Sequence, residues 1–474
     1  MATAINLYFL PLWLPGHIIP MIEAGKRLLD VVDSFSITVL VIRPPPAISI
    51  SVVQSCIDEV SASKYGADFS FQYVPPVDPP ADCEVENFMW HFMQLHAPHV
   101  KAAIAAESTT PASALVVDLF AATILDVADE LGVPGYIYIS STLTSVALAL
   151  SLPALHEKIP VDFEEMEGEI EIPGISPIPP MSMPSPLMNK KSGSYACFLY
   201  LGNLLLKAKG ILVNTAQELE PRIFKAITDG LCVEDRPAPP VYPIGPVIKV
   251  KGAIKHDCTE WLDAQPPSSV VFLCFGSLGC FDAAQVKEMA VGLERSRHRF
   301  LWTLRVPSKS GNVLTPVDAD LETALPEGFL ERTKERGLVW PTWAPQTEIL
   351  SHKAVGVFVT HTGWNSSLES LWFGVPMIPW PLYAEQHLNA FQLVREMGVA
   401  VALKVDRKRG GFVEAAELER AVRCLMEEEN SEEGKKAREK AKEMRVACRK
   451  AVDRGGSSYG FLQKLAEDIL KRSI

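Results

Sequence analysis

The sequence predicts an α/β protein made of two Rossmann-like halves, each built on a parallel sheet. Short apolar runs rich in β-branched residues alternate with helical patterns along most of the 474 residues, which is typical of repeated strand-helix units. This alternation stops at the proline-rich stretch 239–246 and restarts at 270–275, as expected for a linker between two domains. We therefore predict an N-terminal domain over 1–245 and a C-terminal domain over 246–454.

The first half opens with a strand over 5–11, a short loop that contains His17, and a helix with apolar side chains on one broad face. A later strand, 114–120, is interrupted near its carboxyl end by Asp118, where a carboxylate is costly unless it is paired. Because the carboxyl ends of parallel strands share one edge of a sheet, we expect His17 and Asp118 to meet there. The other elements predicted in this half are strands over 36–43, 69–74, 136–139 and 211–215 and helices over 87–106, 123–132 and 195–208.

The second half contains a strand, a tight glycine turn and a helix in direct succession. The strand is predicted over 355–360, the turn over 361–363, and the helix from Asn365 to the stop signal at Gly374. The other elements predicted in this half are strands over 270–275, 337–340, 377–380 and 399–405 and helices over 414–452 and 459–471.

Polar residues around this turn follow the order that a nucleotide sugar needs. Ligands of open α/β sheets bind beyond the carboxyl ends of strands, and the N-terminus of the following helix favours an anion. His361, Asn365 and Ser366 add side-chain donors for a diphosphate, and Gly363 lets a phosphate approach the backbone. The remaining groups of the ligand are assigned by position: a planar base to the Trp343 indole, a ribose diol to Glu369, and sugar hydroxyls to Glu385 and Gln386.

The stretch from Trp343 to Gln386 closely resembles, in length and without a gap, the signature box of plant UDP-dependent glycosyltransferases that act on secondary metabolites. The likeness extends to the segments PGHIIP, VVDLF and ILVNTAQELEP in the first half. This resemblance implies the GT-B fold, in which two Rossmann-like βαβ domains face a central cleft. It also implies that the last helix, 455–474, packs back on the N-terminal domain.

Roles in donor binding follow from this resemblance for most residues of the box. Thr362 stands where relatives often have Cys, and Glu385 stands where they often have Asp, so the carboxylate that faces the sugar has one extra methylene. The predicted roles are UDP binding for Ser277, Trp343, Ala344, Gln346, His361, Gly363, Asn365, Ser366 and Glu369, and sugar binding for Ser140, Trp364, Glu385 and Gln386.

Transfer of glucose to a hydroxyl needs a base for the acceptor proton and stabilisation of the leaving diphosphate. His17 is the predicted base, with Asp118 holding its tautomer and stabilising the imidazolium, and the resemblance assigns the same pair. Backside attack on an α-linked donor gives a β-glucoside, so the transfer is inverting. The resemblance favours UDP-glucose as the donor because Gln386 ends the box.

The acceptor is predicted to be small and apolar, such as a flavonoid, a simple phenol, a terpenoid or another plant secondary metabolite. The sequence leaves open which hydroxyl reacts and whether the new bond goes to oxygen, nitrogen, sulfur or carbon. A loop rich in proline and methionine, 173–186, fits a pocket wall and a surface connection about equally well. The predicted pocket walls, each of which also fits a place in the core, are Trp13, Phe88, Leu119, Phe120, Met181, Phe198 and Tyr383.

Composition excludes several classes of partner. The net charge of −12 and the pI near 5.4 provide no basic field for nucleic acid or an anionic membrane surface. No apolar run reaches the roughly 18 residues of a membrane span, and the nine cysteines show no CxxC spacing. We therefore expect a cytoplasmic monomer. We also expect no metal, because the only DxD-like string, 318–320, lies in a loop that does not follow a predicted strand.

Other functional classes fit the sequence less well. A nicotinamide oxidoreductase needs G-x-G-x-x-G at the first strand-helix junction, which has a single glycine. A phosphorylase needs a basic, often pyridoxal-bearing phosphate site, for which the sequence has no signal. A non-catalytic nucleotide-sugar-binding protein is expected to lack His17 or Asp118, and both are present. This binding protein and a C-glycosyltransferase acting on a phenolic acceptor remain the alternatives.

Overall fold

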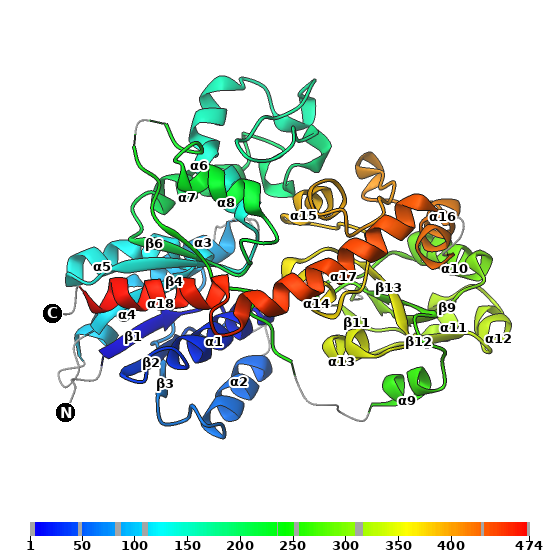
Figure 1. The fold of residues 1–474 in the computed structure, drawn as a ribbon, viewed down its shortest axis with the longest axis horizontal. Helices are drawn as coiled ribbons and strands as arrows, with labels where there is room; N and C mark the ends of the chain where they lie inside the picture. Colours follow the sequence, from blue (N-terminus) through cyan, green and yellow to red (C-terminus); the bar gives the residue numbers. More distant parts are fainter. Residues whose placement is uncertain are drawn as a thin grey trace. The chain divides into compact units, whose positions relative to one another are not determined.

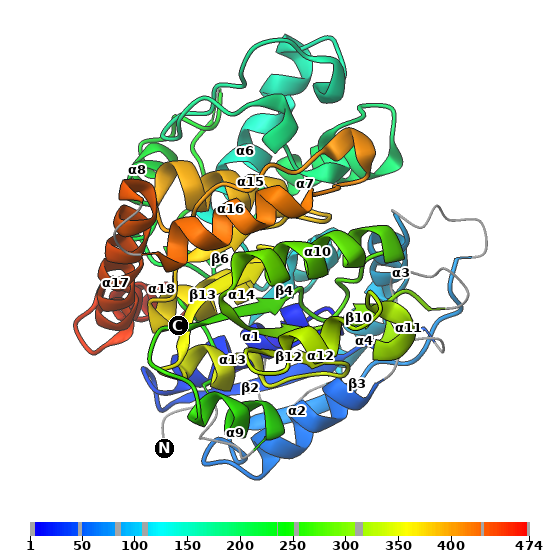
Figure 2. The ribbon, with the colours of Figure 1, turned by 90° about the vertical axis from the view of Figure 1, so that its right-hand side faces the viewer.

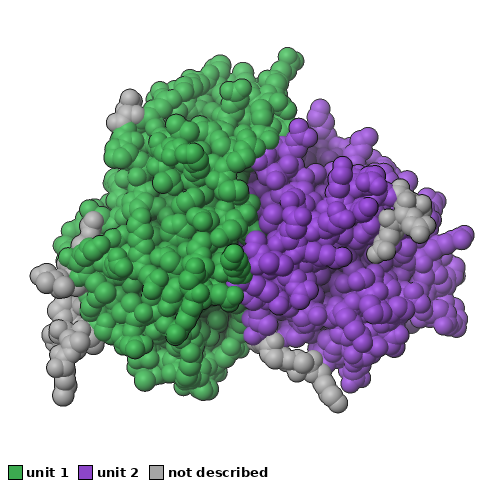
Figure 3. Space-filling view, in the orientation of Figure 1, with its two compact units in different colours: residues 1–180, 186–249, 450–474 green, residues 181–185, 250–449 purple. Residues whose placement is uncertain are grey.

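The computed structural model describes residues 5–45, 50–80, 87–106, 112–234, 236–250, 256–308, 316–427 and 431–471. The chain forms two compact units (Figure 3). Unit 1 contains residues 1–180, 186–249 and 450–474, and unit 2 contains residues 181–185 and 250–449. The main boundary therefore lies a few residues after the predicted one, and the short segment 181–185 belongs to unit 2, which the sequence did not predict.

Unit 1 is built on a parallel sheet of seven strands in the order β3-β2-β1-β4-β5-β6-β7 (Figure 1). The central strands are buried along almost their whole length, which explains their nearly continuous apolar sequences. The strands are β1 (Ile5–Leu10), β2 (Phe35–Val41), β3 (Phe69–Tyr73), β4 (Ala112–Asp118), β5 (Gly135–Ile139), β6 (Gly210–Val213) and β7 (Val241–Pro243).

Helices connect these strands, and the last helix of the chain returns to the same unit. The Tyr242 hydroxyl of β7 donates a hydrogen bond of 2.6 Å to Asp468 in α18, and the Ser458 hydroxyl at the start of α18 donates to the Gly245 carbonyl. The helices of unit 1 are α1 (Pro15–Leu29), α2 (Ser51–Ser61), α3 (Phe88–Leu95), α4 (Ala97–Ala105), α5 (Leu125–Leu131), α6 (Leu143–Lys158), α7 (Gly193–Leu205), α8 (Pro221–Thr228) and α18 (Ser457–Leu470).

Two predicted helices of unit 1 were wrong in detail. The helix expected over 87–106 is divided into α3 and α4, because Pro98 in the first turn of α4 has no N–H to continue the ladder from α3. The helix expected over 123–132 begins earlier, as a 3-10 turn over Leu119–Ile124, because the Asp118 side chain caps the Phe120 N–H.

Unit 2 is built on a parallel sheet of five strands in the order β12-β9-β8-β13-β14, with a separate antiparallel pair formed by β10 and β11. The strand predicted over 399–405 was wrong: only Ala400 forms a bridge, and the Lys404 N–H turns instead to the Glu417 side chain. The strands are β8 (Val270–Cys274), β9 (Arg299–Thr303), β10 (Arg305–Val306), β11 (Val317–Asp318), β12 (Gly337–Trp340), β13 (Val355–Thr360) and β14 (Met377–Pro379).

The helices of unit 2 enclose a core that includes the stacked rings of Phe272 and Phe358 on neighbouring strands. α10 and α16 lie side by side (Figures 1 and 2). The helices are α9 (Asp257–Asp263), α10 (Ala283–Ser296), α11 (Leu321–Ala324), α12 (Phe329–Thr333), α13 (Gln346–Ser351), α14 (Trp364–Phe373), α15 (Gln386–Phe391) and α16 (Ala415–Met426); α17 (Glu432–Val452) ends at the boundary with unit 1.

Candidate functional site

In unit 1, the structure brings His17 and Asp118 together. His17 lies in the first turn of α1, and Asp118 is the last residue of β4. The His17 Nδ1 and an Asp118 carboxylate oxygen are 2.8 Å apart, and the other carboxylate oxygen accepts the Phe120 N–H at 3.0 Å. Asp118 is fully buried, whereas the His17 side chain is 23% exposed. The carboxylate is thus held from two sides, and it orients an imidazole that remains accessible.

Aromatic side chains surround this pair. The Phe120 ring packs edge-on against the His17 ring, with 5.4 Å between centroids, and it also contacts Trp90 at 5.2 Å. Trp90 in turn contacts Phe198, at 6.1 Å. The predicted walls Phe120 and Phe198 therefore belong to one cluster with His17. Its central member, Trp90, was missed because no spacing in the sequence links it to His17.

Three other predicted walls of unit 1 have different surroundings. Trp13 is only 4% exposed and packs edge-on against Phe92, so its ring lies in the core. Phe88 stacks on the same Phe92 with 5.4 Å between centroids and is partly exposed. Leu119 is also partly exposed, in the 3-10 turn that follows Asp118.

The loop between β5 and α6 lies close to His17. The Ser140 hydroxyl, predicted to bind sugar, donates a hydrogen bond of 3.0 Å to the Gly16 carbonyl, directly before His17. A buried carboxylate, Glu220, holds the end of this loop. It accepts the backbone N–H groups of Leu143 and Thr144, both at 3.0 Å, at the N-terminus of α6. Glu220 is part of the ILVNTAQELEP segment, but the sequence did not reveal this partner.

In unit 2, the predicted strand, glycine turn and helix are present as β13, residues 361–363 and α14. The helix ends at Gly374, which has the left-handed φ of 75° expected of a helix stop. His361 lies at the turn, where burial lowers its pKa to about 4, so the imidazole is neutral at pH 7. A Cβ on Gly363 would lie 2.5 Å from His361 Nε2, and one on Gly276 would lie 2.8 Å from the same ring. Both positions must therefore be glycine for the imidazole to take this place.

Ser366, Gln346 and Glu369 form a polar network beside the turn. The Gln346 side-chain amide donates to the Ser366 hydroxyl at 2.9 Å and to the Glu369 carboxylate at 2.7 Å. Burial raises the pKa of Glu369 to about 7, although the hydrogen bond from Gln346 opposes this shift. Three predicted UDP-binding residues are thus already oriented by one another. Asn365 is partly exposed in the first turn of α14.

Trp343 precedes this network and has the exposure that a stacking residue needs. Its side chain is 66% exposed, an unusual degree for tryptophan, while the backbone carbonyl accepts the Trp340 indole N–H at 3.2 Å. Ala344 is buried, and Ser277 is exposed in the loop after β8. The indole is therefore accessible on a loop whose backbone is anchored.

The turn over 382–386 is arranged by Gln386. The Gln386 side-chain oxygen accepts the N–H groups of Leu382 at 2.8 Å and Tyr383 at 3.0 Å, which leaves the amide nitrogen as the group that can donate elsewhere. Glu385 accepts a hydrogen bond of 3.3 Å from the Asn389 side chain. The predicted contact of Gln386 with sugar hydroxyls would therefore use the amide nitrogen, because the oxygen already accepts two N–H groups of the loop.

Thr362 connects this turn to the end of β13. Its hydroxyl lies within hydrogen-bond distance of two carbonyls, that of His361 at 2.5 Å and that of Gln386 at 2.9 Å, and its own carbonyl accepts the Asn389 side chain at 3.0 Å. Its φ of 62° is unusual for a β-branched residue. Relatives often have Cys at this position, and its S–H is only a weak donor. The Thr362 hydroxyl therefore forms a stronger hydrogen bond than a Cys side chain would form here. The Trp364 indole is only 2% exposed and packs in the core, so a role in sugar binding is confined to its backbone.

Among the residues that the structure describes, no three His, Cys, Asp or Glu side chains are grouped as a metal ion would require. Within the DxD-like string, Asp318 pairs with Arg305 and Asp320 caps α11. No helix among the described residues combines the length and the apolar character needed to cross a membrane.

Comparison with known proteins connects the chain to one family. Residues 236–435 match the family model described as UDP-glucoronosyl and UDP-glucosyl transferase. Malvidin galactosylase UGT88C3 of Oryza sativa subsp. japonica is 52% identical, with 98% of this chain and 97% of the relative covered. An anthocyanidin 5,3-O-glucosyltransferase of a Rosa hybrid cultivar is 40% identical, with 95% and 96% covered.

Solved structures show the same relationship. Medicago truncatula UGT71G1, complexed with UDP-glucose, has a TM-score of 0.84 and 35% identity, with 98% of each chain covered. A UDP-glucosyltransferase of Polygonum tinctorium capable of glucosylating indoxyl, in complex with 3,4-dichloroaniline, has a TM-score of 0.87 and 35% identity, with 99% of each chain covered. This chain therefore belongs to the plant UDP-dependent glycosyltransferases and has their GT-B fold.

Proposed function

We propose that this glycosyltransferase is an inverting, UDP-glucose-dependent glucosyltransferase that modifies a hydroxyl of a flavonoid or a simple phenol. The observation that supports its chemistry most strongly is the hydrogen bond of 2.8 Å between a partly exposed His17 and a fully buried Asp118. An accessible imidazole held by a carboxylate is the arrangement that a general base requires.

The transfer needs no group beyond those of the chain and its two substrates. Asp118 accepts the Nδ1–H of His17, so Nε2 is the nitrogen that takes the acceptor proton. The acceptor oxygen attacks the anomeric carbon, the bond from that carbon to the diphosphate oxygen breaks, and UDP leaves with the electron pair. The N-terminus of α14, with His361, Asn365 and Ser366, stabilises the charge on the leaving diphosphate.

Glucose is the proposed sugar because Gln386 ends the box, and relatives with this ending usually use UDP-glucose. The name of the rice relative, malvidin galactosylase, makes UDP-galactose the second candidate. Competition between equal concentrations of the two donors, with the hexose of the product identified by NMR, separates them. Comparable turnover of both donors would show that Gln386 does not set the choice.

The proposed acceptors also agree with the names of the relatives, which refer to malvidin and to anthocyanidins. The aromatic cluster of Phe120, Trp90 and Phe198 beside His17 supports a flat aromatic acceptor, because aromatic rings pack favourably on one another. We further propose that the enzyme acts as a cytoplasmic monomer and without a metal ion.

The decisive test replaces His17 by Ala, with His91→Ala as the control, because His91 is an exposed histidine on α3 of the same unit. We expect transfer to fall by roughly 10² to 10⁴ in His17→Ala, the usual contribution of a general base, and to be unchanged in the control. UDP binding, measured by calorimetry, should persist in both variants, because the predicted UDP ligands lie in unit 2.

The partnership with Asp118 is tested by a double-mutant cycle. Asp118→Asn should preserve the shape but favour the wrong imidazole tautomer, so its loss should be large, and the double variant should be little worse than His17→Ala. Additive losses would contradict the pair. A protein that binds UDP-glucose but transfers sugar to no phenol or flavonoid would instead be the non-catalytic binding protein.

A further inference from the structure

The short segment Met181–Ser185 lies between two parts of unit 1 in the sequence but belongs to unit 2. Its position depends on Arg407. One guanidinium nitrogen donates to the carbonyls of Met181 at 2.8 Å and Met183 at 3.0 Å, and a second nitrogen donates to the Ser185 hydroxyl at 3.2 Å. We name this segment the strap. A single side chain thus holds it at three points.

The strap is also bound to the turn that carries the sugar-binding residues. The Ser185 N–H donates a hydrogen bond of 2.8 Å to the carbonyl of Ala384, which directly precedes Glu385. Ala384 has a φ of 54°, and the N–H groups of the two preceding residues are held by the Gln386 side chain. The strap therefore rests on a tightly constrained turn.

The strap and the turn over 382–386 each carry one large apolar side chain that is exposed on unit 2. Met181 is 42% exposed and Tyr383 is 37% exposed, although side chains of this kind are usually more buried. Both were predicted from the sequence as acceptor-pocket walls. Pro184 and Pro186 flank Ser185 and have no N–H to donate, so neither residue can fix this end of the strap through a backbone donor.

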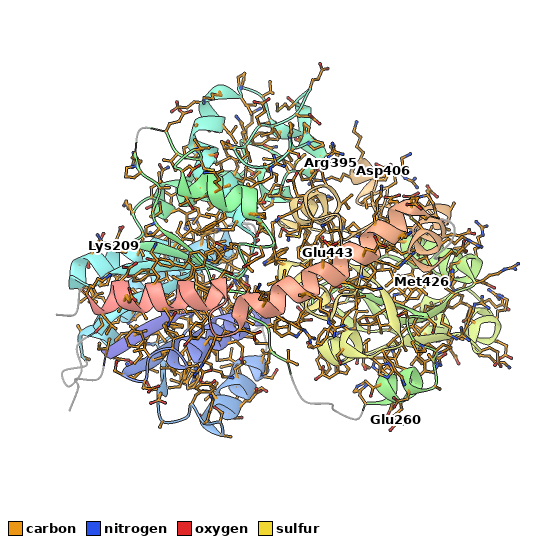
Figure 4. The ribbon with its side chains drawn as sticks, in the orientation of Figure 1. Lys209, Glu260, Arg395, Asp406, Met426 and Glu443 are labelled. Atoms are coloured by element: carbon orange, nitrogen blue, oxygen red, sulfur yellow. The ribbon has the colours of Figure 1, made fainter. Side chains whose placement is uncertain are left out.

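Arg407 is itself firmly placed. It begins a 3-10 turn whose first N–H groups are capped by Asp406, labelled in Figure 4, and Asp406 pairs with Phe412 across an antiparallel bridge. The Arg407 charge also acts on His387 in α15, whose pKa is lowered to about 3 by burial first and by Arg407 second. The guanidinium therefore bonds to the strap and lies near enough to His387 for its charge to act on that side chain.

We propose that Arg407 is a positioning residue that determines acceptor specificity, because it fixes the strap against the turn over 382–386 and thereby holds Met181 and Tyr383 in place for an aromatic acceptor. This inference rests on the proposed transfer to a phenolic acceptor. Lysine cannot replace arginine here, because a single ammonium lacks the planar fork that reaches three acceptors at fixed angles.

The test compares Arg407→Ala and Arg407→Lys with Lys408→Ala, whose side chain is exposed in the same turn. Hydrogen exchange of a peptide spanning 181–187 reports the strap, because Pro184 and Pro186 have no N–H and the amides that it follows are those of Met181, Ser182, Met183, Ser185 and Leu187. We expect exchange about tenfold faster in both Arg407 variants than in Lys408→Ala. This measurement does not depend on activity, so it separates failure of this proposal from failure of the proposed function.

Kinetics then test the consequence for the acceptor. With a flavonol as acceptor, we expect KM to rise about tenfold in both Arg407 variants, with the KM for UDP-glucose and the Kd for UDP unchanged. A simple phenol, which has less surface to contact the two side chains, should be affected less. Unchanged strap exchange, an equal effect in Lys408→Ala, or a parallel loss of UDP affinity would overturn the proposal. Arg407→Lys keeps the charge and so keeps the test valid if Arg407→Ala does not fold.

Discussion

At the scale of single residues, the predicted UDP- and sugar-binding residues are of two kinds: some side chains are already oriented by hydrogen bonds within the protein, and others are exposed. Gln346, Ser366 and Glu369 hold one another through hydrogen bonds of 2.7 and 2.9 Å, and Gln386 is held by its own turn. The Trp343 indole, by contrast, is 66% exposed. Preorganised polar groups lower the entropic cost of binding, whereas an exposed aromatic face gains most from being covered.

Trp343→Ala should weaken UDP binding by about 1 to 3 kcal/mol, because stacking of a base on an aromatic ring is lost. The indole makes few contacts in the free protein, so the thermal stability of the variant should stay close to that of the parent. Calorimetric titration with UDP measures the effect, and Trp364→Phe is not a useful control because that indole lies in the core. An unchanged Kd would remove Trp343 from the site.

Glu369→Gln should change the pH dependence of stability. The folded protein raises the pKa of Glu369 from 4.5 to about 7, so the folded state binds this proton more tightly than the unfolded state. The contribution is therefore fully favourable below about pH 4.5 and is lost as pH rises through 7. Glutamine removes the buried charge, so Glu369→Gln should gain on the order of 1 to 3 kcal/mol at pH 8 and almost nothing at pH 4.

Thermal unfolding of parent and variant at the two pH values measures this difference. An equal shift in melting temperature at both pH values would mean that the carboxylate is not the titrating group. The variant should also bind UDP more weakly, because an amide replaces one acceptor for the ribose diol.

At the scale of elements, helix ends were the features that the sequence identified best. The stop of α14 at Gly374 was predicted from local residues, whereas α1 begins at Pro15 and so includes His17, which was predicted to lie in the preceding loop. The division between α3 and α4 and the loss of the strand over 399–405 were not predicted. The first follows from Pro98, which has no N–H to continue the helix, and in the second the Lys404 N–H donates to Glu417, a partner that periodicity alone does not reveal.

Glu220→Ala should destabilise unit 1 strongly, because it removes the acceptor of two N–H groups at the start of α6 and of the Thr215 hydroxyl at 2.8 Å. We expect a loss of about 3 kcal/mol or more, since these donors would be buried without a partner. The control is Glu218, an exposed neighbour whose carboxylate accepts the Ser457 hydroxyl at 2.8 Å in an exposed hydrogen bond, and Glu218→Ala should stay within about 1 kcal/mol of the parent. Similar melting temperatures for both variants would contradict this role of Glu220.

At the scale of the whole molecule, the chemistry is divided between the two units. His17, Asp118 and the aromatic cluster belong to unit 1, whereas the predicted UDP ligands belong to unit 2. Because of this division, we expect variants of His17 to reduce sugar transfer and variants of Trp343 to reduce UDP binding.

Chelation tests the proposal that no metal takes part. The leaving diphosphate is expected to be stabilised by the N-terminus of α14 with Ser366 and Asn365, so treatment with EDTA should change kcat/KM by less than about twofold. Addition of Mg²⁺ or Mn²⁺ to the treated enzyme should have an equally small effect. A large loss that one of these ions restores would show that the charge is stabilised by a metal instead.

The sequence by itself determined the two parallel sheets and the strand, glycine turn and helix within the stretch 343–386, because strand alternation, glycine turns and helix ends are encoded within a few neighbouring positions. It also indicated that His17 and Asp118 share one sheet edge. Only the tertiary structure decided the hydrogen bonds of this pair, the burial of Trp364, the cap by Glu220 and the three bonds from Arg407 to the strap. Arg407 and Met181 lie 226 positions apart, and such a contact depends on how complete elements pack rather than on any local pattern.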